Sequence, residues 1–111
     1  MKAKSVVSML YCLVNSLAGK DAEITRDPLG KRYEVNKHSL HISTERMPLH
    51  TLQEGIETTL KGWGWVLDKS TSMPCWIFEE DQHQARVTIT SMGTNSIPYL
   101  NLHVMVYRKG E

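Results

Sequence analysis

The chain has 111 residues, of which 41% are hydrophobic and 23% are charged, and its formal net charge is +1. This length and composition suit one globular domain with a buried core, so we expect residues 1–111 to form a single domain. Residues 1–50 hold eight Lys or Arg and five Asp or Glu, and residues 51–111 hold five and seven. Neither half therefore has the concentrated basic face that nucleic-acid binding requires.

An apolar segment near the N-terminus predicts a first helix over residues 4–18. Apolar residues recur on one helical stripe, and Gly19 follows as a C-cap. The stripe is formed by Val6, Leu10, Leu13, Val14 and Leu17. Further apolar residues widen this arc beyond what packing on a sheet requires. We therefore expect a second surface, such as another subunit, to cover part of the helix.

The same segment bears on the location of the protein. Ser8, Tyr11 and Asn15 interrupt it, so we expect neither a cleaved signal peptide nor a membrane span. Cys12 and Cys75 are too few for a disulfide framework. The sequence therefore predicts a reduced, cytoplasmic protein that has no membrane partner.

A β region follows the first helix. Residues 22–26, 31–35 and 39–43 have the composition of three short strands. Asp27-Pro28-Leu29-Gly30 has the residues of a β-turn, and a second turn is expected at residues 36–38. The segment therefore predicts a meander of three strands.

Residues 48–67 predict an amphipathic helix followed by a strand. The helical stripe consists of Leu49, Leu52, Ile56 and Leu60. Pro48 suits the first helical position, although a capping box at Thr51 offers an alternative start. Gly62 is expected to be the C-cap glycine, and residues 63–67 then alternate at the period of a strand.

Further strands are predicted at residues 74–79, 84–92 and 99–108. In the last of them the even positions are all aliphatic and should face the core, whereas the odd positions are polar or amphipathic. The resulting order is α-β-β-β-α-β-β-β-β. We expect an α+β fold in which two helices pack on one face of a curled, mainly antiparallel sheet.

The outer face of the last strand gives the first functional hypothesis. Its candidate residues are Tyr99, His103, Met105 and Tyr107. Tyr and Met are enriched where proteins meet. The sequence therefore predicts a non-enzymatic, homodimeric protein-interaction module, which uses this face and the exposed part of the first helix.

Two alternatives remain. The first is a small-molecule pocket between sheet and helices, lined by Trp63, Trp65, Met73 and Trp76. The second is a small enzyme that uses His41 or His103 with Glu34 or a neighbouring tyrosine. The histidines do not follow the spacing of a zinc motif, so we expect no metal and no cofactor.

Overall fold

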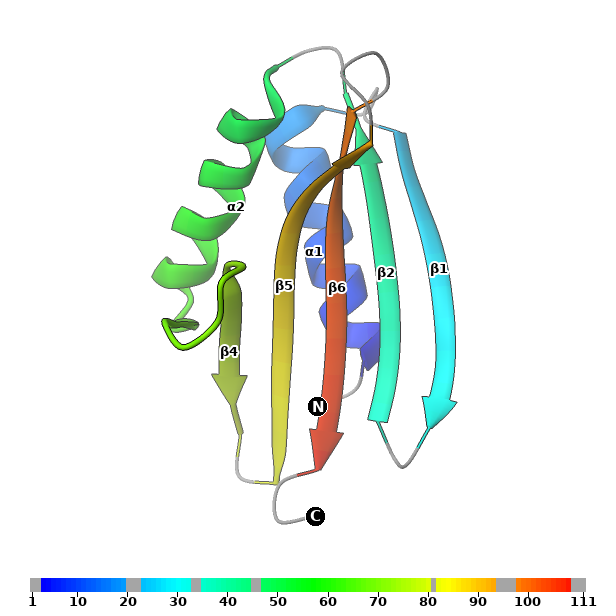
Figure 1. Cartoon of the computed structure of the whole chain (residues 1–111), viewed down its shortest axis with the longest axis vertical. Coiled ribbons are helices and arrows are strands. Elements are labelled where there is room, and N and C mark those ends of the chain that lie inside the picture. The colour runs from blue at the N-terminus through cyan, green and yellow to red at the C-terminus, as the bar shows by residue number, and fades with distance from the viewer. Residues whose placement is uncertain are drawn as a thin grey trace.

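The computed structural model describes residues 3–19, 23–32, 35–44, 47–80, 82–93 and 98–108, with side chains from residues 5–19, 39–44, 47–80, 82–93 and 98–107. In this part of the chain, two helices lie on one face of an open sheet of six strands (Figure 1). The elements are α1 (Ala3–Ala18), β1 (Glu23–Arg32), β2 (Val35–Ser43), α2 (Leu49–Gly62), β3 (Val66–Asp68), β4 (Cys75–Glu79), β5 (His83–Gly93) and β6 (Pro98–Arg108).

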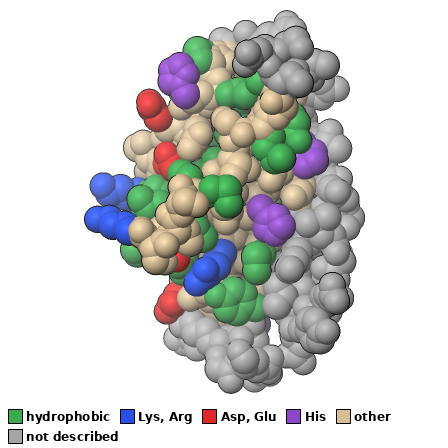
Figure 2. All heavy atoms as spheres, in the orientation of Figure 1, with side chains coloured by type: hydrophobic (Ala, Val, Ile, Leu, Met, Phe, Trp, Pro, Cys, Tyr) green, Lys and Arg blue, Asp and Glu red, His purple; other side chains and the backbone are tan. Residues whose placement is uncertain are grey.

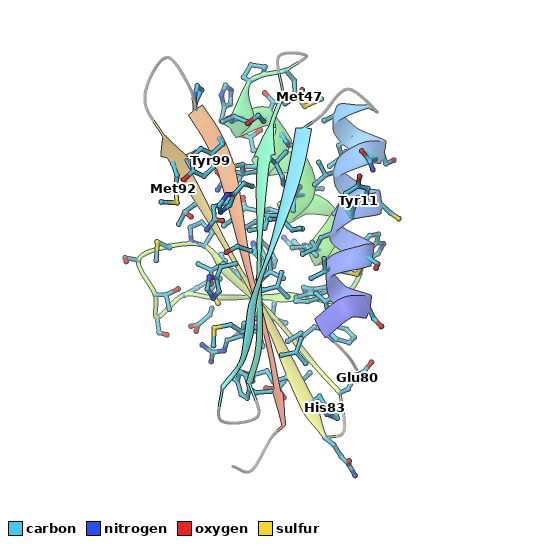
Figure 3. All side chains as sticks on the ribbon, turned by 90° about the vertical axis from the view of Figure 1, so that its right-hand side faces the viewer. Tyr11, Met47, Glu80, His83, Met92 and Tyr99 are labelled. Carbon is cyan, nitrogen blue, oxygen red and sulfur yellow. The ribbon has the colours of Figure 1, made fainter. Side chains whose placement is uncertain are left out.

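The strands lie in the order β1-β2-β6-β5-β4-β3, and each neighbouring pair is antiparallel. The last strand therefore lies at the centre of the sheet and pairs with both β2 and β5. Figure 3 shows the sheet nearly edge-on, with its strands twisted and both helices on the same side. The predicted α+β class, with two helices on one face of an antiparallel sheet, is confirmed.

The predicted three-strand meander is wrong, because the first β region consists of two long strands. Residues 27–30 do not turn the chain but lie within β1, where the register shifts between Pro28 and Gly30. A β-bulge absorbs an extra residue without ending the strand. β1 is an edge strand, and an edge tolerates the missing N–H of proline. The chain reverses instead between Arg32 and Val35, which pair with each other.

The core lies between the helices and the covered face of the sheet. Its largest fully buried side chains come from both helices and from β2, β5 and β6. They include Leu10, Leu40, Ile56, Ile89 and Leu102. The stripe of α2 and the even positions of β6 are buried as predicted.

The end of α2 differs by two residues from the prediction. Gly62 is still helical, and Gly64 adopts the left-handed conformation with a φ of 94°. The N–H of Trp65 donates to the carbonyl oxygen of Leu60 at 3.0 Å, and that of Gly64 to Lys61 at 3.1 Å. These two bonds define a Schellman motif whose C′ residue is Gly64. Residues 63–65 therefore form the helix cap, and β3 begins only at Val66.

The start of α2 is close to the predicted one. The helix begins at Leu49, and Pro48 occupies the N-cap position. The N–H of Leu52 donates to the Pro48 carbonyl oxygen at 3.2 Å. No side-chain hydrogen bond caps this end of the helix, so the alternative capping box is not used.

The helices approach each other at Gly55. A Cβ atom at this position would lie 3.1 Å from Leu17 Cδ1, which is closer than an ordinary van der Waals contact. α1 therefore packs against both the sheet and α2. Among the described residues, neither helix has the length and hydropathy needed to cross a bilayer.

Candidate functional site

The face of the sheet opposite the helices carries the residues that were predicted to bind a partner. The strand register places Tyr99, His103, Met105 and Tyr107 on this face, together with Asn101. Each of these side chains is partly exposed. Figure 2 views the molecule from this side and shows histidine and hydrophobic side chains between polar ones.

We call this surface the open face and define it by five cross-strand rows. Each row joins residues that are paired in the sheet. The rows are Tyr99–Met92; Thr25–His41–Asn101–Thr90; Asp27–Ser39–His103–Thr88–Cys75–Asp68; Lys37–Met105–Arg86–Ile77–Val66; and Tyr107–Gln84–Glu79. The middle row is mainly polar, and its Ser39 and Cys75 side chains are buried.

One end of the open face is built by aromatic and sulfur contacts. The rings of His41 and Tyr99 are 5.1 Å apart between centroids and tilted by 40°. The Tyr99 hydroxyl lies 3.9 Å from the Met92 sulfur. Met92 is 46% exposed, and Figure 3 shows Met92 and Tyr99 on the side of the sheet away from Tyr11 of α1. This end therefore presents a small apolar surface to solvent.

The other end contains a hydrogen-bonded network centred on Gln84. The Tyr107 hydroxyl and Arg86 Nε both donate to Gln84 Oε1, the latter at 3.0 Å. Gln84 Nε2 donates to Glu79 Oε1 at 2.7 Å. Arg86 Nη1 also lies 4.0 Å from Asp68 Oδ2. The charged side chains of this end therefore contact one another.

The pKa of the Asp68 carboxyl clearly departs from its usual value. The Ser70 hydroxyl donates to Asp68 Oδ1 at 2.6 Å, and the Ser70 N–H donates to the same atom at 2.9 Å. Both bonds lower the pKa of the Asp68 carboxyl, and the bond from the Ser70 hydroxyl has the largest effect. The positive charge of Arg86 lowers the pKa by a smaller amount. The carboxylate is therefore held by residues of its own chain.

A buried acceptor lies within the open face. Asn101 Oδ1 is buried and has no hydrogen-bond partner among the described residues. An unsatisfied buried polar group costs about 1–3 kcal/mol, so native structures contain few of them. Asn101 lies between His41 and Thr90, next to the middle row. Because this oxygen is inaccessible to solvent, a donor from another molecule does not reach it in this arrangement.

The second surface expected over the apolar arc of α1 is present within the chain, because α1 packs on both the sheet and α2. Its apolar side chains are buried within the chain by the sheet and α2. These are Val6, Val7, Leu10, Leu13, Val14 and Ala18. The exposed described positions of α1 are Ser5, Ser8, Tyr11, Cys12 and Ser16. Packing on these two neighbours accounts for the buried part of the arc, whereas Tyr11 is 38% exposed.

The alternative ligand residues are divided between three places. Trp63, which is 48% exposed, and Trp65 line a groove of about 260 Å³ together with residues of α1 and β4. Trp76 is buried beneath α2, where its Nε1 donates to Glu57 Oε1 at 3.2 Å. Met73 is exposed in the loop between β3 and β4. The Trp63–Trp65 groove is mostly apolar, with Glu80 on its lining.

A larger, open groove of about 730 Å³ follows β3 and the end of β4. Its lining includes Val66, Leu67 and Ile77. Val66 is 67% exposed. This groove borders the open face, because Val66 and Ile77 also belong to one of its rows.

The histidine hypothesis is only partly covered by the described residues. His41 and His103 lie on the neighbouring strands β2 and β6 and on the same face of the sheet, in two adjacent cross-strand rows. Glu34, the predicted partner, lies outside the described residues. In the part of the chain that the structure describes, no three His, Cys, Asp or Glu side chains are grouped closely enough to hold a metal ion.

Sequence reasoning missed two apolar members of the open face, Met92 and Ile77. It placed Asn101 on the outer side of the last strand but did not identify its buried, unsatisfied oxygen. Period-2 alternation placed each of them on a strand, but only the strand order shows that these strands share a surface.

Comparisons of the chain with protein-family models, with curated protein sequences and with solved structures gave no match.

Proposed function

We propose that the protein is a non-enzymatic protein-interaction module that binds another protein chain through the open face. The observation that carries this proposal is the asymmetry of the sheet. Two helices cover one face, and the other presents Met, Tyr and Ile side chains in registered rows. Interfaces are enriched in such residues and depleted in Lys and Glu.

The homodimer predicted from the sequence is one form of such a module. The support for it comes from the open face rather than from α1, whose apolar arc is used within the chain. A cytoplasmic location accompanies the proposal, since Cys12 and Cys75 are both free thiols. A reducing compartment preserves thiols of this kind.

The test uses the full chain in the cells that naturally produce it. A tagged form is cross-linked in the living cell, and the cross-linked chains are identified by mass spectrometry. The open-face variant combines Tyr99→Ala with Met105→Ala. The matched control combines Ser8→Ala with Ser16→Ala on the exposed side of α1.

We expect the wild type to be cross-linked to a defined partner. The open-face variant should give an at least tenfold weaker cross-linking signal, since a few interface residues usually dominate binding. The control should give the same signal as the wild type. Equal cross-linking by both variants would show that the open face is not the binding surface. A wild-type chain that captures no protein above the level of a tag-only sample would remove the proposal.

A second candidate function is small-molecule binding in the Trp63–Trp65 groove. Its support is the volume of about 260 Å³ and the exposed Trp63 ring. Such a groove suits a small apolar or cationic compound, because the indole face attracts cations. Titration with a panel of such compounds should quench tryptophan fluorescence in the wild type and in Trp76→Phe, and more weakly in Trp63→Phe, which keeps only Trp65 in the groove. Equal quenching in all three proteins would exclude this groove.

A further inference from the structure

We infer that the Trp63–Trp65 groove binds a small, free organic cation that carries a methylated ammonium group, as choline does. This inference rests on the second candidate function, small-molecule binding in this groove, and names the class of ligand. It is independent of the open face, because the groove lies on the side of the sheet that the helices cover.

The groove is formed where the two helices meet the end of β4. Met9 comes from the first half of α1, Trp63 and Trp65 come from the cap of α2, and Phe78 comes from β4. Glu80 follows β4, and Figure 3 shows it next to the first turn of α1 on the helix side of the sheet. Segments that are far apart in the sequence therefore build one binding space.

The aromatic lining is the first argument for a cation. The ring centroids of Trp65 and Phe78 are 5.4 Å apart, and the planes are tilted by 34°. Trp65 is buried, whereas Trp63 is half-exposed at the same groove. The face of an aromatic ring carries partial negative charge and attracts a cation, most strongly when the ring is an indole. A lining with two indoles and a phenyl ring therefore favours a cation over a neutral group of the same shape.

The charge of the lining is the second argument. Among the described residues that line the groove, Glu80 is charged and none is Lys, Arg or His. The two helix ends have opposite effects, since Ser5 lies in the first turn of α1 and Trp63 caps the C-terminal end of α2. Their dipoles offset each other, so the side chains decide the sign of the ligand. An anion would meet a carboxylate and electron-rich rings, whereas a cation is attracted by both.

The size and polarity of the groove identify the kind of cation. Its volume of about 260 Å³ lies just below the range of about 300–1,000 Å³ that is typical of pockets for drug-sized ligands. It therefore suits a compact head group. A primary ammonium is strongly hydrated and would lose hydrogen bonds to water beside Val6 and Met9. A methylated ammonium instead presents methyl groups to these apolar side chains.

The test is a titration of the full chain followed by NMR through the three indole N–H signals, which are assigned with Trp63→Phe, Trp65→Phe and Trp76→Phe. Three ligands of similar shape differ in charge: choline, its neutral isostere 3,3-dimethylbutan-1-ol, and the anion 3,3-dimethylbutanoate. We expect choline to shift the signals of Trp63 and Trp65 but not that of Trp76. Choline should bind about fivefold more tightly than the neutral compound, and the anion should bind most weakly.

Two variants test the residues that carry the inference. Trp63→Leu keeps the lining apolar but removes one ring, so the affinity for choline should fall about fivefold. Glu80→Gln removes the charge with little change in shape. It should lower the affinity for choline about threefold and leave that for the neutral compound unchanged. The matched control is Glu54→Gln, which removes the same charge from an exposed position of α2 outside the groove and should bind as the wild type does.

Circular dichroism establishes that each variant is folded. Equal binding of choline and its neutral isostere would overturn the inference but leave the groove as a site for apolar compounds. Tighter binding of the anion, or no shift of the Trp63 and Trp65 signals by choline, would also overturn it. Choline binding that is unchanged in Trp63→Leu would place the site elsewhere. An equal loss in Glu80→Gln and Glu54→Gln would show that net charge, rather than the groove, attracts the cation, and would overturn the inference too.

Discussion

The two faces of the sheet take their side chains from the same strands, yet they differ in composition and exposure. On the covered face, Val87, Leu102 and Val104 are aliphatic and fully buried. On the open face their chain neighbours Thr88 and His103 are polar and partly exposed. Packing against helices requires apolar side chains on one face only. The side chains of the other face are thus not restricted to apolar types.

The largest expected effect separates the two faces at adjacent positions of β6. Leu102→Ala should lower the free energy of unfolding by about 2–5 kcal/mol, because it opens a cavity in the core. His103→Ala should change it by less than about 1 kcal/mol, since this side chain is only partly buried. Urea unfolding followed by circular dichroism measures both. Equal losses would mean that the two faces do not differ in their contribution to stability.

A second test concerns how α2 ends above the covered face. Gly64→Ala should lower stability by about 1–2 kcal/mol, because alanine is strained at a φ of 94°. Gly62→Ala should raise it by about 0.5–1 kcal/mol, because its Cβ would enter open space at a helical position. Thermal unfolding of the two variants gives the comparison. If Gly62 rather than Gly64 were the cap, Gly62→Ala would lower the stability and Gly64→Ala would raise it.

A third test concerns the hydrogen bond between α2 and β4. Removing the acceptor of Trp76 Nε1 by Glu57→Ala should cost about 1 kcal/mol. Glu57→Gln keeps an acceptor oxygen and should cost less. A double-mutant cycle with Trp76→Phe measures the coupling directly. A coupling energy near zero would show that this bond does not help to hold the covered side together.

The smallest expected effect is a pH dependence at the border of the open face. The pKa of Asp68 is lowered in the folded chain, so its contribution to stability is complete above its usual value of 3.8. The contribution is lost as the pH falls through the lowered folded value. Ser70→Ala should thus reduce the melting temperature slightly at pH 6 and not at pH 2. A deficit of equal size at both pH values would rule out this linkage.

The sequence predicted well the features that depend on local periodicity. The alternation in β6 assigned its residues to the two faces, and the stripe of α2 identified Leu52, Ile56 and Leu60 as core. Gly19 also caps α1 as predicted, with a φ of 82°. In each case the residue pattern and the packing require the same arrangement, so local reasoning is sufficient.

The features that local reasoning missed depend on the position of each strand in the sheet. The residues 27–30 suit a turn equally well as a bulge, and the edge position of β1 decides between them. The choice between Gly62 and Gly64 depends on where Trp65 is buried. The open face itself requires the strand order, because β2, β4, β5 and β6 are scattered along the chain.

The two edges of the sheet limit how copies of this molecule can associate. β1 carries a proline and a bulge, and β3 has three residues, so both edges are poor templates for strand addition. Growth in the plane of the sheet, which leads to fibres, is therefore disfavoured.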